Sequence, residues 1–418
     1  MREVPLAGGL TSDLEALASH PKIASALRFL EEDNSVTVKQ QMAITAIPAP
    51  TFNEAKRGEY YLDQLRRLGL EQVTKDAVGN IYGIRPGTGG GPTLAIFAHL
   101  DTVFPLEINV VPKTREGRIY GPGIADDSRG LATILTILRA LNSENLTTTG
   151  DIIFGATVCE EGLGDLKGVK TYFAKRPDVD GFIALEPGLA GLVTYQCTGS
   201  RRLKVTYKGP GGHSFNDFGK PSAIHAMGRA IAKIGDLKVP SNPKTTFTVG
   251  VVKGGSSVNS LSADAEMLID LRSTSAHSLS LLEKEVVEIV ELSAKTENEC
   301  WSTNTMAVSV ERVGDRPAGD QAVDEPIVQT AAAAAKILKL TPFTQGPKGT
   351  DANVPLNLDV PAITLGCGGD FGGVHSLAEW FDPTEAYRGP QHILLTIVGL
   401  VGKPGVSQAL LKERKKRG

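Results

Sequence analysis

A histidine and an aspartate two residues apart, at the end of an apolar run, constrain this chain more than any other feature. The run Thr93–Phe97 predicts a buried strand, and His99 and Asp101 follow it directly. Side chains at this spacing in extended backbone point to the same side. The pair suits a metal-binding imidazole whose second ring nitrogen is held by a carboxylate. The pair alone also suits local hydrogen bonding. The residues at the other strand ends therefore decide whether it indicates a metal site.

Four further segments place carboxylates or a histidine where predicted strands end or loops begin. A glycine- and proline-rich loop, Tyr120–Gly130, delivers Asp126 and Asp127 directly before a predicted helix. Asp127 or Ser128 suits the helix cap there, while Asp126 points elsewhere. Two apolar strands end in glutamates, and a glycine-rich loop carries a histidine: Glu160 and Glu161 after Ile152–Val158, Glu186 after Phe182–Leu185, and His375 within Gly369–Ser376.

Each of these segments alone has an ordinary explanation as a helix cap, a solvated surface or a turn. Ligands, however, bind at the carboxyl ends of strands in open α/β sheets. The five segments together supply two histidines and several carboxylates, which is the ligand set of a two-metal hydrolytic site.

The order of predicted elements indicates two domains, because 418 residues exceed one compact core. Residues 1–197 alternate helix and strand, which predicts an α/β sheet with helices on its faces. Residues 198–312 run strand, helix, strand, strand, helix, strand, which predicts an inserted α+β domain of the ferredoxin type. Residues 313–418 restore helix and strand and return to the first domain. Within the first domain, one amphipathic helix is predicted over Leu14–Glu31.

Composition excludes several functional classes. The net charge of −3 gives no electrostatic footprint for nucleic acid, and no apolar run is long enough to span a bilayer. Four separated cysteines make neither a zinc knuckle nor a disulfide scaffold. Because the N-terminus lacks a signal-peptide core, we expect a cytoplasmic protein, or a secreted one if a leader was removed.

The five segments, in this order, resemble the M20 family of metallopeptidases and amidohydrolases, which includes glutamate carboxypeptidase, acetylornithine deacetylase, aminoacylase-1 and peptidase T relatives. The resemblance implies a zinc-peptidase-type catalytic domain that binds two Zn²⁺ ions, with Co²⁺ or Mn²⁺ as substitutes. It implies these ligands: His99 and Glu186 on one ion, Glu161 and His375 on the other, and Asp126 bridging both.

The resemblance also assigns Glu160 as the general base, Asp101 as the partner of His99, and a cis peptide bond between Asp126 and Asp127. One departure is Arg129, where the family usually has lysine. Peptidase T-like members carry aspartate where this chain has Glu186. Glutamate there is the pattern of the carboxypeptidase, deacylase and deacetylase members.

The predicted inserted domain resembles the family's lid and dimerisation domain. Its segment Gly209–Ser214 matches the motif whose histidine, here His213, enters the active site, often that of the partner subunit. Asn259 and Arg272 match positions that hold the substrate's carbonyl and free carboxylate. From the residues alone, His213 would be a turn residue and Arg272 a solvated arginine at a strand end. The resemblance thus implies a homodimer built through this domain.

The expected reaction is hydrolysis of an amide bond in a small peptide or an N-acyl amino acid, by an exopeptidase or a deacylase. Three alternatives stand beside it. A ureidohydrolase-like enzyme would act on non-peptide amides, and a non-catalytic binding member of the clan would lack the general base. A Rossmann-like nucleotide binder shares the α/β alternation, but no G-x-G-x-x-G follows the first strands.

Overall fold

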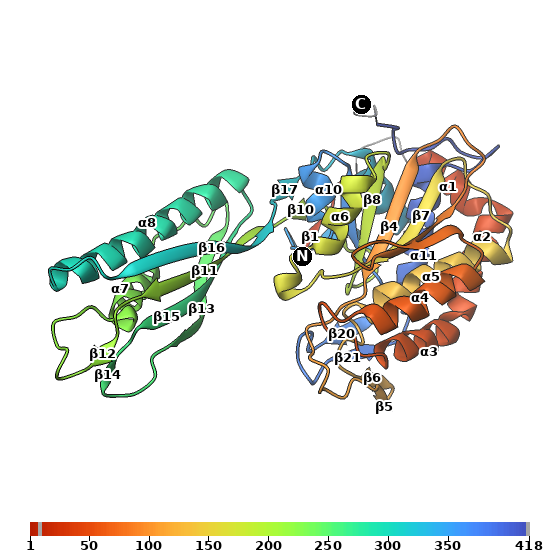
Figure 1. Cartoon of the computed structure of the whole chain (residues 1–418). Helices are drawn as coiled ribbons and strands as arrows, with labels where there is room; N and C mark the ends of the chain where they lie inside the picture. Colours follow the sequence, from red (N-terminus) through yellow and green to blue (C-terminus); the bar gives the residue numbers. More distant parts are fainter. Residues whose placement is uncertain (7–10, 415–418) are drawn as a thin grey trace. The chain divides into compact units, whose positions relative to one another are not determined.

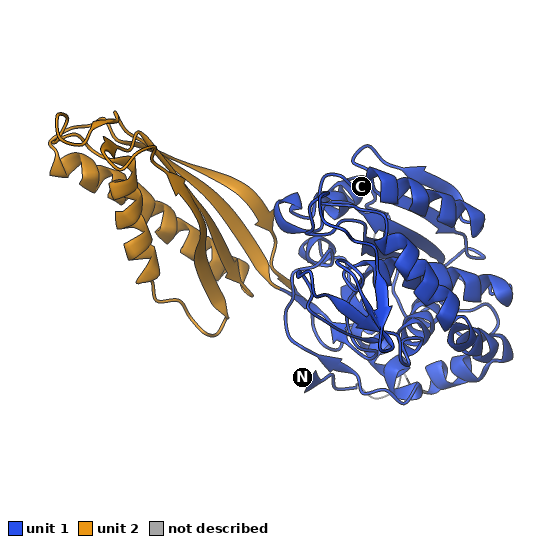
Figure 2. Ribbon diagram, turned by 90° about the horizontal axis from the view of Figure 1, so that it is seen from below, with its two compact units in different colours: residues 1–197, 320–418 blue, residues 198–319 orange. Residues whose placement is uncertain are grey.

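The computed structural model describes residues 1–6 and 11–414. They form two compact units: unit 1 comprises residues 1–197 and 320–418, and unit 2 comprises residues 198–319 (Figure 2). Unit 2 extends past residue 312, where the sequence pattern placed its end, because its last strand continues to Arg316.

Unit 1 is built on a seven-stranded mixed sheet with the order β2-β3-β7-β4-β8-β19-β9 (Figure 1). The four strands β7, β4, β8 and β19 run parallel to one another. Their carboxyl ends therefore meet at one edge of the sheet. The strands are β2 (Glu71–Lys75), β3 (Ile81–Arg85), β7 (Asp151–Thr157), β4 (Thr93–His99), β8 (Gly181–Glu186), β19 (Ala362–Gly366) and β9 (Val193–Thr194).

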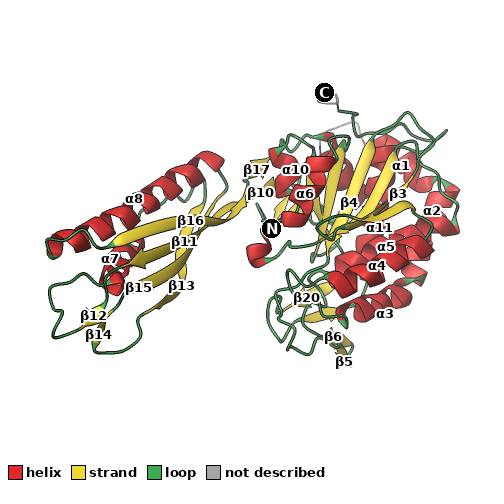
Figure 3. Ribbon diagram, viewed as in Figure 1, coloured by secondary structure: helices red, strands yellow, loops and turns green. Residues whose placement is uncertain are grey.

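Helices cover both faces of this sheet (Figure 3). Along β4, Leu94 and Ile96 pack into the larger core, and Phe97 packs into a second core on the opposite face. The larger core includes residues of α1 (Thr11–Ser19), α2 (Pro21–Glu32), α3 (Asn34–Thr45), α4 (Ala55–Arg67), α5 (Ser128–Ser143), α9 (Pro326–Ile337) and α11 (Arg388–Val401). The second core includes residues of α6 (Lys167–Lys175) and α10 (Asn353–Asn357). The continuous apolar character of the central strands follows from this two-sided burial.

The N-terminal helices differ from the prediction. One helix was expected over Leu14–Glu31, but the chain forms α1 and α2, and Pro21 begins the second. Proline lacks the N–H that an inner helical turn requires, whereas it is well tolerated in a first turn. The helix α3 was not predicted, because three of its four buried residues are polar: Thr37, Gln41 and Thr45.

A small four-stranded sheet with the order β20-β21-β6-β5 joins distant loops of unit 1. Its strands are β20 (Asp370–Gly372), β21 (Trp380–Asp382), β6 (Arg118–Tyr120) and β5 (Lys113–Arg115). Trp380 of β21 pairs with Tyr120 of β6. This pairing brings the chain on either side of His375 next to the loop that carries Asp126.

Unit 2 is an antiparallel sheet with the order β13-β15-β11-β16, and two helices pack on one face. Its elements are β11 (Gly199–Lys208), α7 (Ala223–Gly235), β13 (Thr245–Gly254), β15 (Asp264–Ser273), α8 (Ala276–Cys300) and β16 (Ala307–Arg316). This is the ferredoxin-type order that the sequence predicts. A further pair, β12 (Gly212–His213) and β14 (Ser260–Leu261), places His213 opposite Ser260.

The remaining strands form short pairs: β1 (Arg2–Glu3) with β18 (Phe343–Thr344), and β10 (Gln196–Cys197) with β17 (Gly319–Asp320). Across residues 1–6 and 11–414, we find no helix with the length and apolar character needed to cross a bilayer.

Candidate metal centre

The carboxyl edge of the large sheet gathers most of the predicted ligands. His99 ends β4, Glu186 ends β8, and Glu160 and Glu161 follow β7. Three groups have ligand atoms within 4.8 Å of one another: His99, Asp126 and Glu186; His99, Glu160 and Glu161; and Asp126, Glu161 and His375. The parallel strands thus bring together side chains that lie far apart in the sequence.

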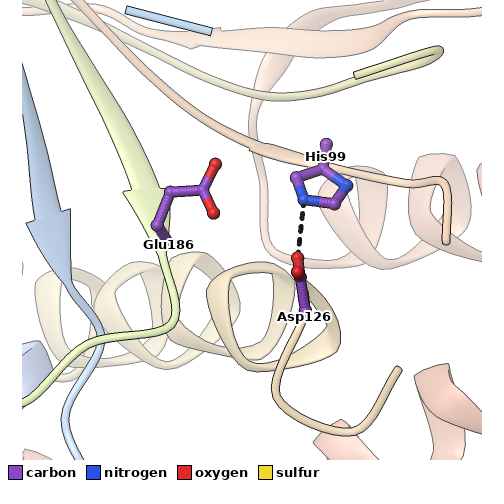
Figure 4. A group of neighbouring side chains, drawn as sticks. All are labelled: His99, Asp126 and Glu186. Carbon is purple, nitrogen blue, oxygen red and sulfur yellow. Dashed lines mark hydrogen bonds and ion pairs between the residues drawn. The ribbon is translucent and has the colours of Figure 1, made fainter. Parts of the chain in front are cut away.

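Asp126 lies between the two histidines. One carboxylate oxygen is 2.9 Å from Nε2 of His99, and the other is 3.1 Å from Nε2 of His375. Nε2 of His375 is also 2.8 Å from a carboxylate oxygen of Glu161. Figure 4 shows His99, Asp126 and Glu186 converging from a strand, a loop and a second strand. The peptide bond between Asp126 and Asp127 is cis, as the resemblance implied.

The ring of His99 is oriented by a hydrogen bond to the backbone two residues further along the chain. Its Nδ1 lies 2.9 Å from the backbone carbonyl oxygen of Asp101, so Nδ1–H donates and Nε2 is left to face Asp126. The Asp101 carboxylate is 3.6 Å from Nδ1, which is too far for a hydrogen bond. The carbonyl oxygen of Asp101 therefore takes the hydrogen bond from Nδ1, while the carboxylate of the same residue stays within ion-pair distance of the ring.

The Asp101 carboxylate instead holds the turn that carries the paired glutamates. Its two oxygens accept hydrogen bonds of 2.9 Å from the backbone N–H groups of Glu160 and Glu161. The hydroxyl of Thr51 donates to one of these oxygens at 2.9 Å. Asp101 is fully buried, so these contacts replace the water it would otherwise bind.

Asp127 has a purely structural surrounding. Its side chain accepts from the backbone N–H of Gly130 at 3.0 Å and caps α5, and it accepts from the N–H of His99 at the same distance. The sequence left Asp127 and Ser128 open as the cap residue. Asp127 takes the role, and Asp126 is thereby free to face the histidines.

Burial and neighbouring charges shift the ionisation of this cluster. Burial raises the pKa of Glu186 well above its usual range. Burial would also raise the pKa of Asp126, but hydrogen bonds with His375 and His99 outweigh it and lower the pKa. Contacts with Asp126 and then Glu161 raise the pKa of His375 to about 10. The cluster therefore gathers several acidic groups, and the positive charge of His375 and His99 stabilises the ionised carboxylate of Asp126.

The sequence reasoning missed Glu379. This carboxylate is fully buried and accepts hydrogen bonds from the backbone N–H groups of Gly123, Ala125 and Asp126, at 2.7, 2.9 and 3.0 Å. Burial raises its pKa to about 7. In the sequence it is a lone glutamate between an alanine and a tryptophan, which is the pattern of any solvated carboxylate.

The three predicted residues of the inserted domain lie in unit 2, outside these ligand groups. Nδ1 of His213 accepts from the backbone N–H groups of Phe215 and Asn216 at 3.2 and 3.4 Å. Nε of Arg272 donates to Asp270 at 2.6 Å. The side-chain oxygen of Asn259 accepts from the hydroxyl of Ser257 at 2.6 Å.

Known proteins resemble this chain in sequence and in fold. The model of peptidase family M20/M25/M40 matches residues 95–398. Succinyl-diaminopimelate desuccinylase of Nitrosospira multiformis is 26% identical over 279 residues, which cover 62% of this chain and 73% of that enzyme.

Solved structures share the fold. A tripeptidase from Staphylococcus aureus is 23% identical with a TM-score of 0.74, over 87% of this chain and 97% of that one. A dinuclear metal binding peptidase of the M20 family from Bacillus subtilis is 16% identical with a TM-score of 0.65, over 88% of this chain and 99% of that one. The chain accordingly belongs to peptidase family M20/M25/M40, and it is a hydrolytic enzyme.

Proposed function

We propose that this enzyme binds two metal ions and hydrolyses the amide bond of a small N-acyl amino acid or peptide. The observation that carries the proposal is the position of Asp126, whose two oxygens each face a different histidine. A carboxylate in this position suits a bridge between two cations. The fold relative from Bacillus subtilis, which is described as a dinuclear metal binding peptidase, supports the same conclusion.

The donor set fits Zn²⁺, which binds imidazole nitrogen and carboxylate oxygen. We assign the ligands as follows: His99 and Glu186 to one ion, Glu161 and His375 to the other, and Asp126 to both. Nδ1–H of His99 donates to a carbonyl, which leaves Nε2 unprotonated for a metal. When bound, the two ions supply Lewis-acid polarisation of the amide carbonyl and lower the pKa of a water molecule.

Glu160 is the proposed general base. It belongs to one group with His99 and Glu161, and only 5% of it is exposed. It takes a proton from the attacking water and returns it to the nitrogen of the leaving amine. Asp101 fixes the backbone of Glu160 and so limits where this carboxylate can reach.

Unit 2 supplies the proposed contacts with the rest of the substrate. Because two backbone N–H groups donate to Nδ1 of His213, its neutral ring carries the proton on Nε2, as a donor to an oxyanion requires. Arg272 pairs with the substrate's free carboxylate and Asn259 with its carbonyl, as the family motifs imply. We also propose a homodimer through unit 2.

Two features favour an acyl amino acid over a tripeptide. The relative from Nitrosospira multiformis is a desuccinylase, and Glu186 stands where peptidase T-like members carry aspartate. The test is a comparison of kcat/KM for N-succinyl and N-acetyl amino acids, dipeptides and tripeptides, using purified zinc-loaded enzyme. Hydrolysis of at least one class, abolished in Glu160→Gln, is the expected result. Fully metal-loaded wild-type enzyme that cleaves none of them would contradict the proposal.

A further inference from the structure

Both oxygens of the buried Glu379 carboxylate accept hydrogen bonds from the backbone of a single loop. One oxygen accepts from the N–H of Gly123, and the other accepts from the N–H groups of Ala125 and Asp126. Residues 123–126 of this loop end at Asp126, whose carboxylate lies between His99 and His375. Glu379 is therefore bonded directly to the backbone of Asp126.

Glu379 also connects the loop that carries Asp126 with the loop that carries His375. It stands four positions after His375, and its backbone N–H donates to Ser376 at 3.1 Å. Its backbone carbonyl accepts from Gly121 at 3.0 Å. Glu379 therefore contacts both the segment that follows His375 and the loop that leads to Asp126.

The direction of a short aspartate side chain follows from its backbone, because only two torsions separate the backbone from the carboxylate. A shift of the Asp126 peptide would turn one oxygen away from its histidine. Residues that orient ligands in this way have large effects on metal affinity.

We propose that Glu379 is a positioning residue that holds Asp126 between His99 and His375, and so fixes the carboxylate that would hold both metal ions. The inference rests on the proposed metal site. It differs from a general stabilising role in one respect: loss of Glu379 changes the metal site more than it changes the fold.

The substitution Glu379→Gln tests this with the volume preserved. An amide has one acceptor oxygen, and its NH₂ group would face a backbone N–H that now has an acceptor. The matched control is Asp180→Asn. Asp180 is also buried and accepts from two backbone N–H groups, those of Thr93 and Arg414, at 2.8 and 2.7 Å. It precedes β8, at the end of the large sheet opposite the ligands.

Two measurements on the full-length chain separate the outcomes. In the metal-free protein, hydrogen exchange of the amides in residues 121–127 should be about tenfold faster in Glu379→Gln, and unchanged in Asp180→Asn. In Co²⁺ titrations followed by visible absorption, Glu379→Gln should bind roughly 10- to 100-fold more weakly with an altered spectrum. Asp180→Asn should match the wild type in both affinity and spectrum.

Wild-type Co²⁺ affinity and spectrum in folded Glu379→Gln would overturn the inference, while leaving the proposed function intact. Failure of the wild-type chain to bind metal would instead overturn the proposed function, and exchange at residues 121–127 would still report on the Glu379 contacts. If Glu379→Gln loses its far-ultraviolet circular dichroism, Glu379→Asp takes its place. That variant keeps the charge but is one methylene too short to reach all three N–H groups. Unchanged metal affinity in Glu379→Asp would likewise overturn the inference.

Discussion

Asp101 and Glu160 are joined by a hydrogen bond of 2.9 Å from the backbone N–H of Glu160 to the Asp101 carboxylate. Asp101 follows β4 and Glu160 follows β7, which are parallel neighbours in the large sheet. The contact ties the strand that ends in His99 to the turn that carries the proposed base. The positions of the proposed metal ligand His99 and of the proposed base Glu160 are therefore coupled through one buried carboxylate.

The substitution Asp101→Asn should slow turnover even at metal concentrations that saturate the proposed site. Both carboxylate oxygens of Asp101 accept backbone N–H groups, and an amide can satisfy only one of these donors. We expect kcat to fall roughly 10- to 100-fold as Glu160 loses its position. Steady-state kinetics with parallel metal analysis checks this, and Asp180→Asn is the control. Wild-type kcat in Asp101→Asn would show that the turn is held by other contacts.

The paired glutamates should separate into two roles. Glu160→Gln should reduce kcat by about 100- to 10,000-fold, because an amide cannot accept the proton of the attacking water. Its metal content should remain close to that of the wild type. Glu161→Gln should lower metal affinity as well, because Glu161 lies 2.8 Å from Nε2 of His375 in one ligand group. Full activity in Glu160→Gln would show that the base is another residue.

The stability of the metal-free protein should depend on the charge of His375. Asp126 and Glu161 raise the pKa of His375 from 6.5 to about 10 in the folded chain. A raised folded pKa means that the contribution is complete below pH 6.5 and is lost as the pH rises towards 10. The Tm difference between wild type and His375→Gln should therefore shrink over this range. A difference that grows with pH would contradict the assigned contacts.

Unit 2 should contribute to catalysis and to binding through different residues. His213→Ala should lower kcat by about 100- to 1,000-fold with both metals bound, because it removes the proposed donor to the oxyanion. Arg272→Ala should chiefly raise KM and reduce the preference for substrates with a free carboxylate. Both effects are read from kinetics on a matched pair of substrates, with and without that carboxylate. Wild-type kinetics for His213→Ala would remove unit 2 from the proposed mechanism.

The sequence predicted the ligand cluster because each member stands where an apolar strand ends or a glycine-rich loop begins. Parallel strands bring such ends to one edge, so the pattern indicated that these side chains gather there. The pairing of His99 with Glu186 came from the family resemblance, and the two residues end neighbouring strands. The contacts of Asp101 and Glu379 were beyond the sequence. Their partners are backbone N–H groups of distant residues, and every non-proline residue has such a group.

The helices show the same limit. The helix α5 could be predicted from its apolar residues and from the aspartate at its start. The helix α3 buries Thr37 and Gln41, whose hydroxyl and amide groups bond to carbonyl oxygens or a carboxylate inside the protein. A buried face made partly of polar side chains has no apolar period, so no pattern indicates it.

The measurement that bears most directly on the account is the metal content of the chain. Wild-type protein and Asp126→Ala are loaded with Zn²⁺, freed of excess by gel filtration and analysed for metal by mass spectrometry. The account predicts about two zinc ions per wild-type chain, since Asp126 faces both histidines. It predicts a clear loss of zinc in Asp126→Ala, with the fold retained. Wild-type protein that retains no zinc, or an Asp126→Ala variant that binds two ions as tightly as the wild type, would contradict it.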